Sequence, residues 1–371
     1  MASIFISAGE ASGDIHAGKL VRALRELRPS LGVRAVGGES LRGAGAEVVF
    51  PMEELAAMGL WEAAGRIPAL LRARRTVLSD LECHRPDVFV PVDFGGLNLR
   101  LAGAARAAGI PVVYYIPPKV WAWGSWRAKR LREAVEEALV ILPFEEELLG
   151  ARGVRATYVG SPVLDHIGPR SFDPEADTVG LLPGSRAGEV SRIWPLLLEA
   201  ARLLAARRPL RFLVPRAPGL PAELFALDPG SGLSLEVVTG RAQEVMERSA
   251  LCLVASGTAT LECAVVGTPM VVVYRVSALT YFLGKRLLSV PFVSLPNLIA
   301  GRRIVPELVQ TSAEAVAGAA EPLLEGGPER EEMLAALAGV RELLGGPGAS
   351  VRAARRLLTL LEDVTWSSSR A

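Results

Sequence analysis

A carboxylate follows directly after one of the most apolar segments of the chain. Asp93 comes after Val88–Val92, whose β-branched and aromatic residues are typical of a buried strand. At the carboxyl end of such a strand a side chain can face a ligand cleft, and a carboxylate there can take a proton from an attacking hydroxyl. Asp93 is therefore the candidate general base. The alternative interpretation is an aspartate that caps the next helix.

Small residues and two carboxylates follow the first apolar run. The segment 7–14 reads Ser-Ala-Gly-Glu-Ala-Ser-Gly-Asp and lets a ligand approach backbone N–H groups at the start of a helix. Its glycine spacing matches neither the dinucleotide fingerprint nor a P-loop. Two interpretations stay open: a tight turn between strand and helix, or a polar pocket in which Glu10, Ser12 and Asp14 face a substrate.

Two further glycine turns lie in the second half of the chain. In the first, an arginine is placed to meet a phosphate. In the second, hydroxyls and N–H groups suit a pyrophosphate, and a glutamate one turn later can accept both hydroxyls of a ribose. Each turn alone is weak evidence, but together they favour a nucleotide diphosphate. The residues concerned are Gly184, Ser185, Arg186, Ser256, Gly257, Thr258 and Glu262.

Half of the six tryptophans fall within residues 121–126, beside two prolines and a lysine. Trp121 and Trp123 are candidates to line an apolar or sugar-binding pocket. The alternative is an ordinary aromatic core.

The His and Cys residues show no metal-ligand spacing, so we expect neither a metal nor another cofactor. No serine-hydrolase signature is present either. The cysteines are odd in number and widely spaced, which fits a reducing cytoplasm. These residues are His16, His84, His166, Cys83, Cys252 and Cys263.

Two parallel sheets would position these residues. Short β-branched runs alternate with longer helical patterns in both halves, which is typical of βαβ units. The expected strands are Ile4–Ser7, Val33–Val36, Val88–Val92, Val112–Ile116, Leu139–Leu142, Tyr158–Val159, Val179–Leu182, Arg211–Val214, Leu235–Val238, Leu251–Val254 and Met270–Tyr274. Leucines at three- and four-residue spacing predict a helix over Gly18–Arg28. The predicted fold class is α/β, with two Rossmann-like doubly wound domains facing a central cleft.

A stretch rich in proline, glycine and charge begins at residue 166 and is the expected linker. We therefore expect one domain over residues 1–165 and a nucleotide-binding domain over 166–345. The remaining segment, 346–371, carries an amphipathic helix over Ser350–Asp363 that is expected to pack back on the first domain.

The composition limits the partners. The 371 residues carry a net charge of +1, so no field of one sign favours nucleic acid, and we expect none. No segment is long and apolar enough to cross a membrane, and we expect a cytoplasmic protein. A high mean hydropathy nevertheless leaves room for a surface that touches lipid.

Taken together, the motifs resemble one family over nearly the whole chain: the lipid-A-disaccharide synthases, inverting glycosyltransferases of the GT-B type. The resemblance rests on SAGEASGD (7–14), MEELAAMGL (52–60), VWAW (120–123), LPFE (142–145), LLPGSRAGEV (181–190), ASGTATLEC (255–263), SLPNLIAGR (294–302) and PELVQ (306–310).

The resemblance implies transfer of a 2,3-diacylglucosaminyl unit from UDP to 2,3-diacylglucosamine 1-phosphate, without a metal. The products would be a β-1',6-linked disaccharide phosphate and UDP. It implies that Asp93 is the catalytic carboxylate and Glu262 the ribose ligand, and that Asn297 and Gln310 belong to the nucleotide site. The acceptor and lipid side would then be the first domain.

Both implied substrates carry acyl chains, so the enzyme would contact the inner face of the cell membrane as a peripheral protein. The segment Met58–Leu78 mixes apolar residues with arginines, as an interfacial helix would. The alternative is a core helix with a solvated basic edge. Family members can also form homodimers by exchanging C-terminal segments.

The chain departs from the family pattern on the acceptor side. Where the family has D-x-P-D-F-N, this chain has Asp93 followed by Phe94, Gly95, Gly96, Leu97 and Asn98, without the second carboxylate. Ser161 and Pro117 replace a histidine and a serine. Two other readings therefore stay open: a UDP-sugar 2-epimerase, and a UDP-sugar- or lipid-binding protein with altered or lost acceptor specificity.

Overall fold

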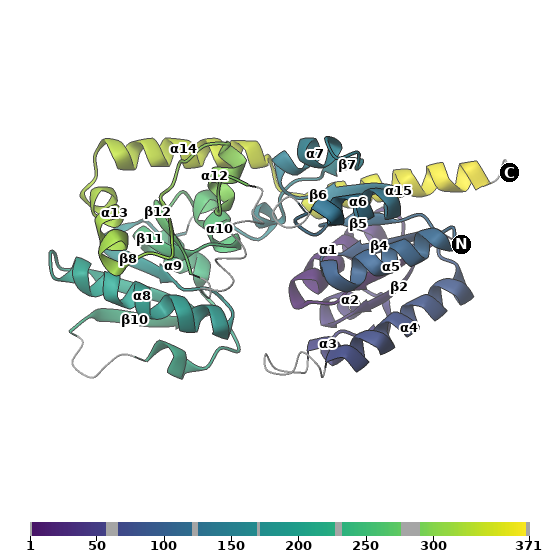
Figure 1. Cartoon of the computed structure of the whole chain (residues 1–371), viewed down its shortest axis with the longest axis horizontal. Helices are drawn as coiled ribbons and strands as arrows, with labels where there is room; N and C mark the ends of the chain where they lie inside the picture. The colour runs from purple at the N-terminus through teal and green to yellow at the C-terminus, as the bar shows by residue number, and fades with distance from the viewer. Residues whose placement is uncertain are drawn as a thin grey trace. The chain divides into compact units, whose positions relative to one another are not determined.

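The chain forms two units, each built around its own parallel sheet (Figure 1). A computed structural model describes residues 2–56, 66–120, 125–168, 171–226, 232–275 and 290–368. The first unit comprises Met1–Pro162 and Pro347–Ala371, and the second comprises Val163–Gly346. Sequence segments far apart therefore meet in the first unit, where the C-terminal helix joins the N-terminal sheet.

The sheet of the first unit has seven strands in the order β3-β2-β1-β4-β5-β6-β7. All the pairings are parallel. The direction of strand addition reverses between β1 and β4, which is the doubly wound arrangement predicted from the sequence. The strands are β1 (Ser3–Ala8), β2 (Gly32–Gly37), β3 (Glu47–Pro51), β4 (Val88–Val92), β5 (Val113–Tyr115), β6 (Glu137–Val140) and β7 (Ala156–Tyr158).

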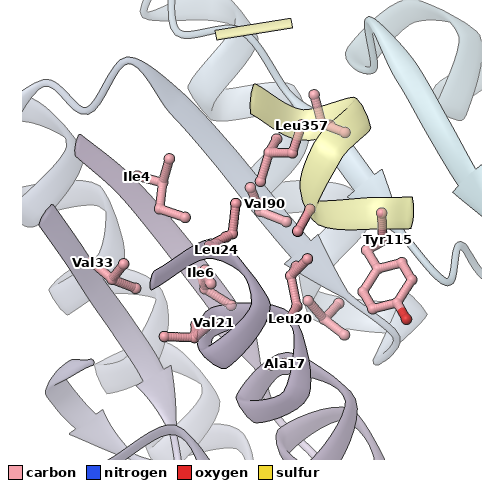
Figure 2. Close-up of a cluster of buried hydrophobic side chains, with 14 of the residues drawn as sticks. Ile4, Ile6, Ala17, Leu20, Val21, Leu24, Val33, Val90, Tyr115 and Leu357 are labelled. Atoms are coloured by element: carbon pink, nitrogen blue, oxygen red, sulfur yellow. The ribbon is translucent and has the colours of Figure 1, made fainter. Parts of the chain in front are cut away.

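Successive side chains along the strands of this sheet belong to two hydrophobic clusters, one on each face. Ile4 and Ile6 of β1 belong to one cluster and Phe5 to another, because successive residues of a strand point to opposite faces. Helices α1 and α15 complete the first cluster, and Figure 2 shows Leu357 of α15 near Leu20 and Leu24 of α1 over the strands. Helices α4 and α5 complete the second. The helices of this unit are α1 (Ala11–Leu27), α2 (Glu39–Gly43), α3 (Glu53–Ala56), α4 (Arg66–His84), α5 (Gly95–Ala107), α6 (Ser125–Ala134), α7 (Pro143–Gly150) and α15 (Ala349–Ser368).

Helix α1 begins at Ala11, seven residues before the expected start at Gly18. The N–H of Asp14 already bonds to the carbonyl of Glu10 at 2.9 Å. The small residues from Ala11 onward thus form the first turn of the helix, where Asp14 also suits the positive end of the helix dipole.

The C-terminal helix is tied to the sheet by an ion pair between Arg356 of α15 and Glu137 of β6. The Arg356 guanidinium donates to both carboxylate oxygens, at 2.7 and 2.6 Å, and Glu137 is fully buried. The hydroxyl of Thr157 donates to the same carboxylate at 2.7 Å. The apolar stripe of α15 and this buried pair together place residues 349–361 in the first unit.

The second unit repeats the arrangement with six strands, in the order β10-β9-β8-β11-β12-β13, again all parallel. Helix α8 packs against α13, and α10 packs against α12 and α14. The strands are β8 (Glu175–Leu182), β9 (Arg211–Arg216), β10 (Ser234–Thr239), β11 (Ser249–Ala255), β12 (Met270–Tyr274) and β13 (Glu307–Val309). The helices are α8 (Ala187–Ala205), α9 (Ala242–Arg248), α10 (Thr258–Val266), α12 (Leu295–Ala300), α13 (Ala313–Glu325) and α14 (Pro328–Leu344), with short 3-10 helices η1 (Pro162–Asp165) and η2 (Ala222–Phe225).

Two findings concern only the part of the chain that the structure describes. None of its helices is both long and apolar enough to cross a membrane. Among the same residues, no group of three His, Cys, Asp or Glu side chains is placed to hold a metal ion.

Candidate functional site

In the first unit, the candidate residues meet where the strand order reverses. β1 and β4 are neighbours, with Ala8 paired to Val92, so the segments that follow them leave the sheet side by side. The hydroxyl of Ser12 lies 3.5 Å from Oδ2 of Asp93. Asp93 is half-buried and Ser12 is exposed. Ligands of doubly wound sheets bind at this reversal, so the structure places Asp93 where a substrate group can reach it.

The backbone at Asp93 is held in an unusual conformation. Asp93 and Phe94 have φ angles of 49° and 50°, in the left-handed region that few residues with a side chain adopt. Two consecutive residues of this kind persist only where their surroundings hold them, and they are typical of functional sites. Helix α5 has Phe94 as its N-cap residue and no side-chain cap hydrogen bond there. The alternative interpretation, in which Asp93 caps that helix, is therefore wrong.

Two residues whose roles are not predictable from the local sequence pattern hold this turn in place. The buried amide of Asn98 donates to the carbonyls of Val92 and Asp93 at 3.1 and 3.0 Å, and to that of Ser7 at 2.9 Å. The phenol of Tyr114 donates to the Asp93 carbonyl at 2.8 Å. Burial, followed by the nearby Asp93 carboxylate, raises the pKa of Tyr114 well above its ordinary value, so the phenol keeps the proton that it donates. An asparagine between leucines on an apolar helix was the available signal, since a buried amide requires partners.

Close packing explains the glycines on either side of this turn. A side chain at Gly9 would collide with the ring of Phe94, and a Cβ atom at Gly95 would lie 2.6 Å from Cβ of Pro118. A larger residue at position 95 would therefore require Pro118 to shift.

The remaining candidates of the first unit have different positions. Glu10 is exposed at the start of α1. Asp14 is only 3% exposed, and its carboxylate accepts hydrogen bonds from the N–H groups of Gly38, Ser40 and Leu41 at 2.7, 2.9 and 3.4 Å. The expectation that Asp14 contacts the acceptor is therefore corrected: its carboxylate holds the start of α2. Trp121 and Trp123 lie outside the described residues.

In the second unit, the two glycine turns also meet at the reversal of strand order. β8 and β11 are neighbours, with Leu182 paired to Val254. The turn after β8 contains Gly184, with φ 111°, and the exposed Ser185 and Arg186.

A carboxylate outside the predicted set of site residues completes this turn. Glu189 accepts backbone hydrogen bonds from Ser185 and Arg186, and a side chain at Gly184 would collide with it. Burial raises the pKa of Glu189, an effect that these hydrogen bonds and two nearby arginines offset only in part. The signal was a glutamate three residues after an N-cap, as in a capping box. Since Glu189 uses the two N–H groups, a phosphate contact at this turn falls to the Arg186 guanidinium.

The turn after β11 offers fewer amides than expected. The N–H of Ser256 donates to the carbonyl of Val273 at 2.9 Å and its hydroxyl donates to that of Val293 at 2.8 Å. Ser256 is therefore corrected from an anion donor to an anchor of the turn. Gly257 and Thr258 are exposed, and Thr258 begins α10, so this turn keeps the positive end of a nine-residue helix.

Glu262 lies on the first turns of α10 with its side chain 22% exposed, and its Oε1 is 3.5 Å from Nε2 of His166. His166 was not selected from the sequence, because its neighbour lies almost a hundred residues away. Gln310 follows β13 in a left-handed conformation, φ 51°, and its N–H donates to the Tyr274 carbonyl at 3.0 Å.

Asn297 is completely buried and its side chain is fully bonded within the protein. Its amide donates to the Val305 carbonyl and to Glu307 at 3.0 and 2.8 Å, while its oxygen accepts from the N–H groups of Ile304 and Val305 at 2.7 and 3.0 Å. An asparagine amide side chain has two donors and two acceptor positions, and all four are used here. The expectation that Asn297 contacts the nucleotide is therefore corrected to a positioning role.

Known proteins resemble this chain both in sequence and in fold. The family model for lipid-A-disaccharide synthetase matches residues 4–336. The lipid-A-disaccharide synthases of Myxococcus xanthus and Azotobacter vinelandii are 44% and 43% identical to it, covering 96% and 97% of this chain and 97% and 98% of their own.

Among solved structures, the kitacinnamycin glycotransferase has a TM-score of 0.64 at 16% identity, covering 96% of this chain and 98% of its own. The S. aureus MnaA–UDP co-structure has a TM-score of 0.66 at 13% identity, covering 98% and 97%. At these identities the structural likeness concerns the fold alone, and it agrees with the predicted pair of Rossmann-like units.

Proposed function

Because the chain belongs to the lipid-A-disaccharide synthase family, we propose that it moves a 2,3-diacylglucosaminyl unit from UDP to 2,3-diacylglucosamine 1-phosphate. The chain is a glycosyltransferase of lipid A biosynthesis. The observation that carries the proposed chemistry is the position of Asp93. It is half-buried, in a left-handed turn, at the point where the strand order of the first unit reverses.

In the proposed reaction, Asp93 removes the proton from the 6-hydroxyl of the acceptor sugar as that oxygen attacks C1 of the donor sugar. The new C1–O6 bond forms on the face opposite the diphosphate, the bond between C1 and the phosphate oxygen breaks, and the configuration at C1 inverts. UDP leaves with the bonding electrons. Asn98 and Tyr114 take no part in this proton transfer but hold the Asp93 backbone.

The second unit would bind the nucleotide. Arg186 and the N-terminus of α10 stabilise the charge that develops on the leaving diphosphate, so the proposal includes neither a metal nor another cofactor. Glu262 accepts the ribose hydroxyls, and Gln310 lies at the end of the neighbouring strand. Gly184, Ser185 and Gly257 shape the two turns.

The test is turnover of the purified protein with UDP-2,3-diacylglucosamine and 2,3-diacylglucosamine 1-phosphate in detergent. We expect UDP release together with a disaccharide phosphate, identified by mass spectrometry. An epimerised UDP-sugar, or UDP binding without any product, would contradict the proposed reaction.

Contact with the membrane surface is a second part of the proposal. The described part of α4 buries Ala69, Ala73 and Val77 in the core, as in the core-helix interpretation. Its other side exposes Leu71, 46% accessible, next to exposed arginines at 72, 74 and 75. An exposed leucine among arginines suits the surface of an anionic bilayer. We propose that this side of α4 touches the inner face of the cell membrane.

The double variant Arg74→Gln/Arg75→Gln is expected to bind vesicles containing phosphatidylglycerol about 30-fold more weakly, since each basic side chain near such a surface contributes about 1 kcal/mol. Sedimentation with vesicles measures the change. The control, Arg22→Gln/Arg100→Gln, removes the same charge from exposed positions on α1 and α5. Equal loss in both variants would show a general charge effect and reject α4 as the contact.

A homodimer formed by exchange of C-terminal segments also remains a proposal taken from the family. The segment available for exchange is α15, which packs against α1 of its own unit through Ala353, Ala354 and Leu357.

A further inference from the structure

A single carboxylate organises the polar groups behind the second-unit site. Glu307, the first residue of β13, accepts hydrogen bonds at Oε2 from the N–H of Val293, at 3.0 Å, and at Oε1 from the N–H of Ser294, at 2.8 Å. Its Oε1 also accepts from the Ser294 hydroxyl at 2.6 Å and from the Asn297 amide at 2.8 Å. Ser294 and Asn297 are completely buried. Four donors on one carboxylate make a rigid junction between β13 and the start of α12.

This junction reaches the turn at the start of α10. The carbonyl of Val293, whose own N–H is bonded to Glu307, accepts the hydrogen bond from the Ser256 hydroxyl at 2.8 Å. Ser256 is also anchored through its N–H to Val273. The exposed Gly257 and Thr258 follow immediately, so their position depends on Ser256.

The same junction reaches Gln310. Glu307 is paired with Val272 of β12, and three residues later the N–H of Gln310 bonds to the carbonyl of Tyr274. The segments after β11, β12 and β13 thus leave the sheet at one edge. Glu307 is bonded to Val293, which supports the turn after β11, and it lies on β13, which leads to Gln310.

We propose that Glu307 is a positioning residue for nucleotide binding: it holds the turn at Ser256–Thr258 and the end of β13 in the arrangement that receives UDP, without touching the ligand. The inference rests on the proposed function, since it assumes that this edge binds UDP. Glu307 thereby has a role within the motif PELVQ, in addition to Gln310, which the family resemblance assigns to the nucleotide site.

The first test is the Kd for UDP, measured by calorimetry with the full chain. Glu307→Gln keeps the size of the side chain but puts an NH₂ group where N–H donors now point, and it is expected to weaken UDP binding at least about tenfold. At saturating donor, kcat is expected to fall while KM for the donor rises, because the turn that Glu307 holds leads into the N-terminus of α10, which stabilises the leaving diphosphate in the proposed reaction. Glu236→Gln is the matched control, because Glu236 lies on β10 of the same unit in an ion pair with Arg211.

A double-variant experiment tests whether Glu307 acts through Val293 and Ser256. If Glu307 acts through Val293 and Ser256, the effects of Glu307→Gln and Ser256→Ala on the Kd are expected to be less than additive in the double variant. Should Glu307→Gln fail to fold, Ser294→Ala removes one of the four donors and leaves the carboxylate, and a loss of at least about threefold in UDP affinity is expected.

The outcomes separate the two proposals. A wild-type chain that does not bind UDP would overturn the proposed function and, with it, this inference. A wild-type chain that binds UDP, with variants that bind it equally well despite a lower Tm, would leave the proposed function standing and make Glu307 purely structural. Fully additive effects of Glu307→Gln and Ser256→Ala would overturn the route through Val293.

Discussion

Turnover of the Asp93→Asn variant is expected to be at least about a hundredfold below wild type, the usual loss when a general base is removed. Asparagine removes the charge, keeps the shape, and adopts the left-handed conformation required by the φ of 49° more readily than alanine does. The measurement is UDP release with saturating substrates.

The structure also predicts what should not change in that variant. Asn98 and Tyr114 bond to the backbone carbonyl of Asp93, so the turn and the Tm are expected to be preserved. UDP binding should also be preserved, since every residue proposed to bind UDP belongs to the second unit. Glu133→Gln is the control, because it removes the charge of an exposed carboxylate on α6 of the same unit. Wild-type turnover in Asp93→Asn would remove Asp93 from the mechanism.

The Arg356→Ala variant is expected to lose about 3 kcal/mol of stability, at the lower end for breaking a buried ion pair because the Arg356 side chain is 33% exposed. The reason is that the carboxylate of Glu137 is fully buried and, among the described residues, would keep the hydroxyl of Thr157 as its side-chain hydrogen-bond donor. Calorimetry should show the Tm of the first unit fall by about 6–12 °C. The control is Arg355→Ala, an exposed arginine on the same helix, for which a change within about 0.5 kcal/mol is expected.

The same pair predicts a dependence on pH. Burial raises the pKa of Glu137, but hydrogen bonds from Arg356 and Thr157 and the nearby arginine charges outweigh it, so the pKa in the folded protein lies below the ordinary 4.5. A lowered pKa means that the stabilising contribution is complete above about pH 4.5 and is lost as the pH falls through the folded value. In Arg356→Ala the same buried carboxylate lacks its guanidinium partner and is protonated at a higher pH than in wild type. The difference in Tm between wild type and Arg356→Ala should therefore narrow as the pH falls, until the carboxylate is protonated in both proteins. A difference that stays constant would show that the lost stability does not come from the charged pair.

The sequence by itself determined the fold class and the places where chemistry can occur. Strands such as Val88–Val92 were predictable because β-branched runs are a local signal, and their alternation with helices predicts parallel sheets. The turns at Asp93, Gly184 and Gly257 were found in the same way, since parallel strands place the segments after them at one edge of the sheet. Weaker local signals were missed: β3 is edge-located and half-exposed, and β13 has three residues.

Only the tertiary structure decided which polar side chains face a ligand and which serve the protein. Asp14, Ser256 and Asn297 have the residue types of a binding site, yet their hydrogen bonds go to the protein. Conversely, Asn98 and Glu307 became important through their partners. A hydrogen bond to a group tens of residues away leaves no local pattern, whereas a strand or a turn does. The pairing of Glu137 with Arg356, which are 219 residues apart, is the extreme case. Neither residue stands out in the sequence. The pair is needed because the Glu137 carboxylate is buried, and a buried charge requires a partner.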